Sequence, residues 1–137
     1  MTDTDLVHKK LAVIETCVQE LRTLGHPADI RSDLREFRFS AYTLQIAIQA
    51  ALDVAAHIVS GEHLGEPRTN RQLFELLVHH GWLPGELAAA LHGMVGFRNI
   101  IVHAYESVDP KIVEGIVLHE LDDLLAFVQA IRARLGG

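Results

Sequence analysis

The segment 41–59 constrains the fold of this chain more than any other stretch does. Its residues are apolar almost all round a helix rather than along one face. A helix of this kind must be surrounded by other elements, so it belongs in the middle of a helical bundle. No apolar run in the chain reaches the roughly 20 residues of a membrane span. We therefore expect this segment to be the second part of a central helix that begins between Asp29 and Asp33 and ends near Val59.

Helical periods and helix boundaries recur along the rest of the chain. Apolar residues in the segment 7–21 follow one another at steps of three and four, which is typical of an amphipathic helix. Thr69 or Asn70 suits the start of a short helix, and Asp109 followed by Pro110 suits the start of another. We find no strand pattern and no internal repeat. The sequence predicts one all-α domain over residues 1–137, an up-and-down bundle of about five helices: 5–24, 29/33–59, 71–80, 84 to about 103, and 110–135.

Composition is typical of a globular protein in a reducing compartment. Nearly half of the 137 residues are hydrophobic, which suits a packed core. Cys17 is the lone cysteine, so an intrachain disulfide is excluded, and its place beside an apolar stripe favours a small buried side chain over a reactive thiol. The first residues lack the basic and apolar regions of a signal peptide. We expect a cytoplasmic protein with no membrane segment.

The net charge bears on whether the protein can bind nucleic acid. It is −6 at neutral pH, so bulk attraction to a polyanion is excluded and any such contact must come from a local basic site. Arg31, Arg35 and Arg38 lie close together in the sequence. The favoured interpretation is a solvated helix face with local ion pairs; the alternative is a patch that contacts phosphate groups.

The stretch 94–105 carries the residues best suited to chemistry. It is mostly apolar, yet it contains Arg98, Asn99, His103 and Tyr105. Polar groups inside an apolar run must find partners or stay in water, so their presence here indicates a structural or functional role. Arginine offers a planar fork of donors for phosphate oxygens, and histidine readily gives or takes a proton near neutral pH. Together these groups can bind a phosphodiester and move a proton beside it without a metal.

The same residues carry a family resemblance. The string Gly-Phe-Arg-Asn-x-x-Val-His-x-Tyr at 96–105 resembles the signature of the HEPN superfamily and, more narrowly, that of HepT toxins from HepT/MntA toxin–antitoxin systems. The resemblance covers nearly the whole chain. It implies a helical, homodimeric, metal-independent RNA endonuclease with no cofactor, in which a ribose 2′-hydroxyl attacks the adjacent phosphate. It also implies a partner, an MntA-like nucleotidyltransferase antitoxin that attaches AMP to the signature tyrosine, here Tyr105.

The resemblance assigns roles to the signature residues. His103 would act as general base or acid, Arg98 would hold the phosphate and stabilise its developing charge, and Asn99 would position the histidine or the phosphate. Arg98 and His103 are five positions apart, about 140° around an ideal helix. One helix therefore does not easily aim both side chains at one point. Either Arg98 of one subunit approaches His103 of another, or the helix ends near His103.

Two glycines stand inside the same predicted helix. Ala89, Gly93, Gly96 and Ile100 follow at steps of four, three and four, which makes a smooth face for another helix. Each interior glycine costs about 1 kcal/mol against alanine, so the face needs a purpose. It is either a contact within the bundle or, as we favour from the resemblance, the seam of a homodimer.

A polar stripe crosses the apolar central helix at steps of three and four: Tyr42, Gln45, Gln49, Asp53 and His57. One interpretation is hydrogen bonding to neighbouring helices. The other, supported by a similar run in HepT proteins, is a supporting set that orients the Arg98/His103 site. We expect none of the five to be catalytic.

Other site classes find little support. His79 and His80 are adjacent and point to different faces, and no zinc-binding spacing occurs, so we expect no metal. The alternative function is a non-catalytic HEPN companion of a nucleotidyltransferase, in which the signature binds a nucleotide without cleaving RNA. The complete signature favours the nuclease, and the acidic charge favours the companion.

Overall fold

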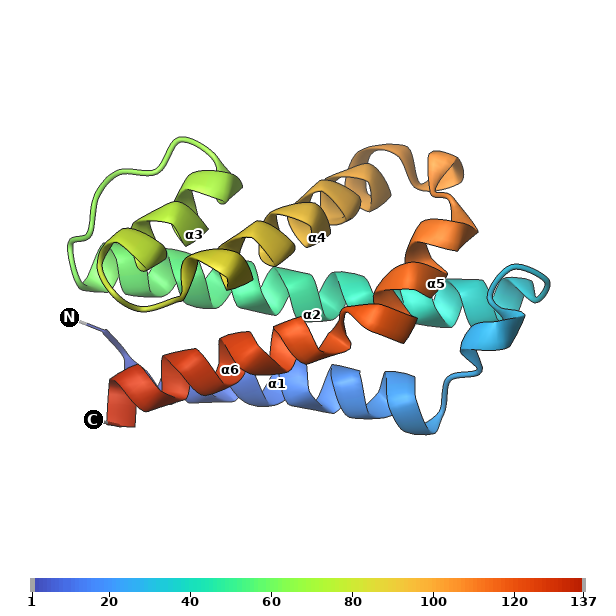
Figure 1. Cartoon of the computed structure of the whole chain (residues 1–137), viewed down its shortest axis with the longest axis horizontal. Coiled ribbons are helices and arrows are strands. Elements are labelled where there is room, and N and C mark those ends of the chain that lie inside the picture. The colour runs from blue at the N-terminus through green and yellow to red at the C-terminus, as the bar shows by residue number, and fades with distance from the viewer. Residues whose placement is uncertain (1, 137) are drawn as a thin grey trace.

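The protein is built from six α-helices and two short 3-10 helices (Figure 1). The computed structural model describes residues 2–136, with the side chain of Tyr105 outside that description. No strand occurs among these residues. The elements are α1 (Thr4–Thr23), η1 (Pro27–Asp29), α2 (Leu34–Gly61), α3 (Asn70–His79), α4 (Gly85–Ala104), η2 (Tyr105–Ser107), α5 (Pro110–His119) and α6 (Leu121–Gly136).

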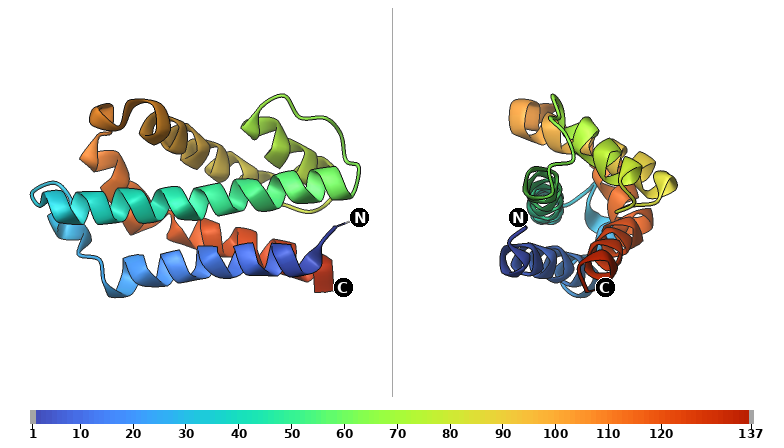
Figure 2. Two further views of the ribbon diagram at one scale, coloured as in Figure 1. Left: turned by 180° about the vertical axis from the view of Figure 1, so that it is seen from behind. Right: turned by 90° about the vertical axis from the view of Figure 1, so that its left-hand side faces the viewer.

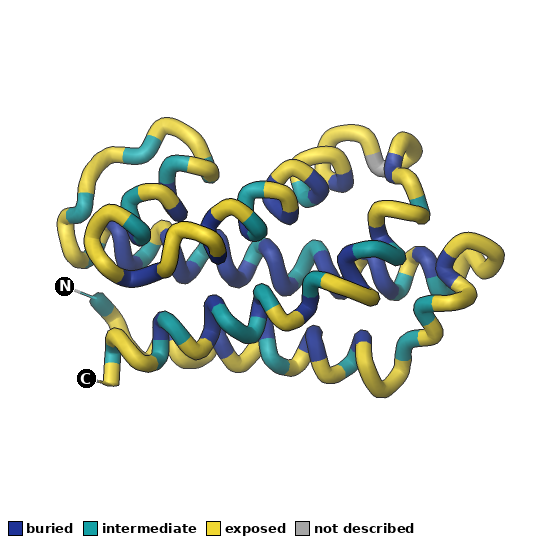
Figure 3. Tube along the Cα trace, in the orientation of Figure 1, coloured by how far each residue is buried: buried dark blue, intermediate teal, exposed yellow. Residues whose placement is uncertain are grey.

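The longest helix, α2, lies in the middle of the bundle. The antiparallel pair α1 and α6 packs along one side of it, and α3 with α4 packs on the other side (Figures 1 and 2). The short α5 connects the two sides and contacts η1 and the first part of α2. Buried residues of all six helices meet in one hydrophobic cluster, which Figure 3 shows as the inner faces of the helices. The prediction of an all-α bundle with a central apolar helix is confirmed.

Side-chain caps explain where most helices begin. The carboxylate of Asp33 accepts a hydrogen bond from the backbone N–H of Arg35, and Asp109 does the same for Lys111. The hydroxyl of Thr69 accepts from the N–H of Gln72, so Thr69 rather than Asn70 caps α3. Each cap satisfies a donor that the first turn leaves without a partner. The predicted start at Asp109-Pro110 is confirmed.

The prediction of one last helix over 110–135 was wrong. The chain forms two helices there, because Glu120 leaves the helical conformation at φ −122° and ψ 1°. Asp122 and Asp123 then lie in the first turn of α6, where carboxylates are favoured by the helix dipole. The bend lets α5 pack on η1 and α2 while α6 packs on α1. It also raises the number of α-helices from about five to six.

Two helices, α2 and α4, are long and apolar enough on average to cross a membrane, although no uninterrupted apolar run was expected to reach that length. Length and composition alone are weak signs of a membrane segment, because a core helix has the same properties. In α2, 56% of the most apolar window is buried inside the protein, as a central helix requires. In α4 the buried share is 39%, so its exposed apolar residues need a separate explanation.

Cys17 is buried in the core, as the sequence predicts. Burial raises the pKa of its thiol, and the nearby charge of Glu20 raises it further. The thiolate is the reactive form of cysteine, so this side chain is kept inert and serves as core packing.

An ion pair between α1 and α6 makes stability depend on pH. Both guanidinium Nη atoms of Arg132 donate to the carboxylate of Glu15, at 2.7 and 2.6 Å. These hydrogen bonds hold the pKa of Glu15 below its ordinary value, against the opposing effect of burial. The folded-state pKa is thus lower than the unfolded one. The pair therefore stabilises the fold above the unfolded pKa, and this contribution is lost as the pH falls through the folded value.

We expect Arg132→Gln to lower the free energy of unfolding by about 0.5–1 kcal/mol at neutral pH, since both side chains are partly exposed and solvent screens them. The difference should shrink below the ordinary glutamate pKa of about 4.3. Urea unfolding of both proteins at neutral and acid pH measures it. Arg35→Gln is the control, because Arg35 is exposed and forms no ion pair with any described residue. A difference that does not change with pH would assign the effect to packing rather than charge.

Candidate functional site

The candidate site lies at the C-terminal end of α4, whose two faces differ sharply. One face is buried against the bundle through Leu87, Leu91, Met94, Phe97 and Ile101. The other face is exposed and begins with Ala89 near the start of the helix. It continues through Gly93 and Gly96 to Ile100, which is 42% exposed, and the neighbouring Val102 is 44% exposed. The helix therefore presents an open apolar face that ends at the signature.

The glycines of this face make no close contact inside the chain. A Cβ atom placed on Gly93 or on Gly96 would meet no atom within 4 Å. The first of the two interpretations, a contact within the bundle, therefore fails for the described residues. The two glycines make the helix less stable than alanines would, and the smooth surface that they form is not covered by any other part of the described chain.

Asn99 and His103 are exposed on α4, and Arg98 is partly buried beside them. Nη1 of Arg98 donates to Oδ1 of Asn99 at 3.2 Å. Nε of Arg98 is buried and has no hydrogen-bond partner in the described structure. Such a donor is costly unless something supplies an acceptor. Arg98 thus keeps one donor without a partner among the described residues.

Arg98 and His103 belong to the same continuous helix. α4 ends at Ala104, one residue after His103, so the predicted helix end near His103 is confirmed, and both residues still lie within the helix. Tyr105 opens the 3-10 turn η2 that follows, and its side chain lies outside the described residues. The polar contact of Arg98 in the described structure is with Asn99 rather than His103. A single chain therefore places the predicted catalytic residues on one helix and joins Arg98 to Asn99, while no hydrogen bond among the described residues joins Arg98 to His103.

The polar stripe of α2 is directed toward α1. Asp53 accepts from Nε2 of Gln49 at 2.9 Å and pairs with Nζ of Lys10 at 3.1 Å. Nε2 of His57 accepts from the backbone N–H of Asp3 at 2.9 Å. Tyr42 and Gln45 line a hollow of about 310 Å³ on the same side, and Tyr42 is 65% exposed.

These bonds hold α1 against α2, in keeping with the hydrogen-bonding interpretation of the stripe. Among the described residues, no hydrogen bond joins the stripe to Arg98 or His103. A role in orienting the Arg98/His103 site would therefore require the stripe of one chain to meet the signature of another.

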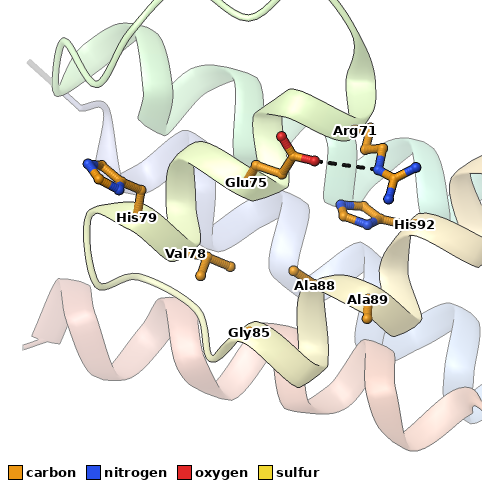
Figure 4. Close-up of a pocket in the computed structure, with 8 residues that line it drawn as sticks. All are labelled: Arg71, Glu75, Val78, His79, Gly85, Ala88, Ala89 and His92. Atoms are coloured by element: carbon orange, nitrogen blue, oxygen red, sulfur yellow. Dashed lines mark ion pairs between the residues drawn. The ribbon is translucent and has the colours of Figure 1, made fainter.

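A second hollow, which the sequence did not predict, lies between α3 and α4 and has a volume of about 460 Å³. Figure 4 shows the Arg71–Glu75 ion pair, at 3.4 Å, beside the ring of His92, with His79 at the far end. Nε2 of His92 is buried and has no partner among the described residues. A histidine within the apolar run of α4 was the signal available in the sequence. In the described part of the chain, no three histidine, cysteine, aspartate or glutamate side chains gather as a metal site would require.

Comparisons with known proteins agree with this fold. The sequence model described as "Ribonuclease HepT-like" matches residues 13–131. The chain is 32% identical over 130 residues to the mRNA nuclease HepT of Shewanella oneidensis, which covers 94% of this chain and 98% of that protein. It is 31% identical over 107 residues to the tRNA nuclease HepT of Aphanizomenon flos-aquae, covering 78% of this chain and 73% of that protein.

A solved structure extends the likeness to three dimensions. It contains the tri-AMPylated HEPN toxin of Shewanella oneidensis in complex with an MNT antitoxin. The TM-score is 0.86 at 31% identity, and the match covers 97% of this chain and 99% of that one.

Fold and relatives together define an endoribonuclease of the all-helical HEPN type. More narrowly, the chain belongs to the HepT-like ribonuclease family.

Proposed function

We propose that this protein is the toxin of a HEPN/MNT toxin–antitoxin system and cleaves RNA without a metal ion, as one HEPN-like domain in the cytoplasm. The observation that carries the proposal is the exposed end of α4. There Arg98 keeps a buried donor without a partner, and Asn99 and His103 face solvent on a helix whose other face is in the core. A helix end with a purely structural role has no need of an arginine, an asparagine and a histidine in this arrangement.

The proposed reaction is an internal transesterification. The 2′-hydroxyl of a ribose attacks the adjacent phosphorus, the 2′-O–P bond forms, and the bond to the 5′-oxygen of the next nucleotide breaks. His103 takes the proton from the 2′-hydroxyl or gives one to the leaving oxygen. Arg98 donates hydrogen bonds to the phosphate oxygens as charge builds up, and Asn99 holds the Arg98 guanidinium through the observed contact. The products are a cyclic phosphate and a free 5′-hydroxyl, and a DNA strand is not cleaved, because it lacks the nucleophile.

We propose that two chains complete the site. Arg98 and His103 diverge by about 140° on an ideal helix, and the apolar face beside them is uncovered. A twofold pairing of α4 helices would cover this face and bring Arg98 of one chain toward His103 of the other. It would also cover the exposed apolar residues Ile100 and Val102 of α4.

The pairing can be tested by replacing both Gly93 and Gly96 with leucine. Nothing in the same chain lies within 4 Å of either new Cβ atom, so the fold should tolerate the change. In the dimer the bulky side chains would hold the two helices apart, at a cost of about 1–3 kcal/mol per site. We expect the dimer to dissociate at concentrations where the wild type stays paired, as measured by light scattering.

Gly115→Leu is the matched control, because Gly115 is also a helical glycine with open space around it but lies on α5. It should leave the dimer unchanged. If the Gly93/Gly96 variant forms a dimer as stable as that of the wild type, this face of α4 is not the dimer interface.

We further propose that a nucleotidyltransferase antitoxin neutralises the protein by attaching AMP to Tyr105. The support is the AMPylated toxin of the related complex and the position of Tyr105 directly after α4. A growth assay tests toxin and antitoxin together. Induced expression of this chain alone should stop growth and degrade cellular RNA. Co-expression of a nucleotidyltransferase encoded in the adjacent reading frame should restore growth and protect the RNA.

The second candidate is a non-catalytic helical companion of a nucleotidyltransferase. The net charge of −6 favours it, since an acidic protein repels RNA outside local basic sites. The same growth assay separates the two candidates. A non-catalytic companion that is expressed alone would leave growth and cellular RNA unchanged.

A further inference from the structure

A groove of about 590 Å³ lies beside the end of the signature helix, between the start of α2 and the turn η2. Its floor is apolar and includes Phe37, which is 9% exposed, and Val108, which is 8% exposed. Leu34 also lines the groove and is 60% exposed. Glu106, the neighbour of Tyr105 in η2, lines it as well.

The charged groups of the groove differ in how they are bound. Arg31 is held by Glu114 of α5, with Nε at 3.1 Å and Nη2 at 2.7 Å from the two carboxylate oxygens. Asp33 accepts the capping hydrogen bond of α2. Arg38 is exposed and forms no ion pair or hydrogen bond with any residue that the structure describes. The groove thus keeps one cation available for a ligand.

We propose that this groove binds a nucleotide of the RNA next to the scissile phosphate, with Arg38 on its phosphate and the exposed side chain of Leu34 under its base. This inference rests on the proposed function, because it adds a subsite to the same RNA-cleaving centre. A guanidinium beside an apolar platform is the combination that holds a phosphate and a base at once. The volume lies within the range of about 300–1,000 Å³ that small-ligand sites occupy.

Three observations favour RNA as the occupant. The net charge of −6 means that RNA must be held by a few local cations, and Arg38 is free to be one. The groove is continuous with α4 through η2, so a strand that reaches His103 is only a turn away from it. Glu106 also lines the groove and repels a phosphate, so the backbone of the strand is favoured at Arg38 rather than at Glu106.

Arg35 offers a matched control for Arg38. It is also exposed, lies on the same helix and forms no ion pair among the described residues, but it does not line the groove. The assay follows the fluorescence anisotropy of a 5′-fluorescein single-stranded RNA of mixed sequence. It compares Arg38→Ala and Arg35→Ala in a His103→Ala background, which keeps the RNA uncut.

Arg38→Ala should weaken RNA binding about tenfold, the size expected for one charge-assisted hydrogen bond. The slope of log affinity against log salt should also fall by about 0.7, since one phosphate contact is lost from a single strand. Arg35→Ala should change neither quantity. In the active protein, Arg38→Ala should raise KM and leave kcat unchanged, because the contact is made equally before and during the reaction.

If Arg35→Ala and Arg38→Ala lose RNA affinity equally, the proposed subsite is wrong, since the result would indicate a general effect of surface charge and not a binding site. No loss in Arg38→Ala would overturn it as well. The proposed function fails by a different result, namely that the wild-type protein cleaves no RNA. Binding in the His103→Ala background is measured independently of cleavage, so the two failures are distinguishable.

Discussion

His103→Ala should reduce the rate of RNA cleavage by the purified protein by about 10²–10⁴-fold, the contribution typical of a general acid or base. His103 is exposed and is the penultimate residue of α4, so alanine removes no core contact. Arg98→Ala should cause a loss of about 10²–10³-fold, as for other groups that stabilise charge in a transition state. Alanine is also the best helix former, so both variants should keep the helical content of the wild type.

The cleavage assay needs a histidine control and a metal control. His119→Ala is the former, because His119 is likewise exposed in the last turn of a helix but lies on α5, away from the signature. It should cleave RNA at the wild-type rate. EDTA should have no effect, since the proposed chemistry uses no metal. Cleavage by His103→Ala at the wild-type rate, or wild-type cleavage that stops with EDTA, would contradict the mechanism.

Tyr105→Phe should escape modification by the antitoxin and stay toxic in its presence. The variant removes the acceptor oxygen and keeps the aromatic ring. AMP on Tyr105 would add a bulky nucleotide and a phosphodiester charge two positions after His103 in the chain and next to Glu106, which lines the groove. RNA would then be excluded both sterically and by charge, without any change in fold. Intact-mass spectrometry after co-expression with the adjacent transferase measures the modification directly.

The chain holds only two tyrosines, which makes the control simple. Tyr42 is 65% exposed on α2 and contacts the hollow beside α1, so Tyr42→Phe should be modified like the wild type. One or more adenylyl groups should appear on the wild type and on Tyr42→Phe, and none on Tyr105→Phe. An adenylyl group retained by Tyr105→Phe would place the acceptor elsewhere. An unmodified wild type beside an active transferase would disprove the modification.

Helix positions were predictable because they depend on local interactions. Thr69 and Asp109 cap their helices through backbone groups two or three residues away, so the sequence carries the whole cause. The bend at Glu120 was not predictable by the same means. Buried residues continue at helical spacing through it, from Val117 to Leu121 and Leu124, so the apolar period is the same for one helix or two. Only the packing of α5 and α6 on different neighbours decides between them.

Arg31 illustrates a limit on reading charge from sequence. Its cluster with Arg35 and Arg38 was expected to form local ion pairs, yet Arg31 binds Glu114, a residue 83 positions away, and the other two form no ion pair with any described residue. A helix period shows which residues share a face but not which distant segment meets that face. The proposed groove was hidden for this reason, since its two walls come from α2 and η2.

By itself the sequence determined the all-helical class, the apolar central helix, the caps and the signature residues at 98–105, because these follow from side-chain chemistry at short spacing. Tertiary structure alone decided that Gly93 and Gly96 face open space, that the polar stripe of α2 bonds to α1, and that Arg38 is left free beside η2. Each of these depends on which surfaces of distant segments come together. That choice is made by burial of the whole apolar surface at once, and no local pattern records it.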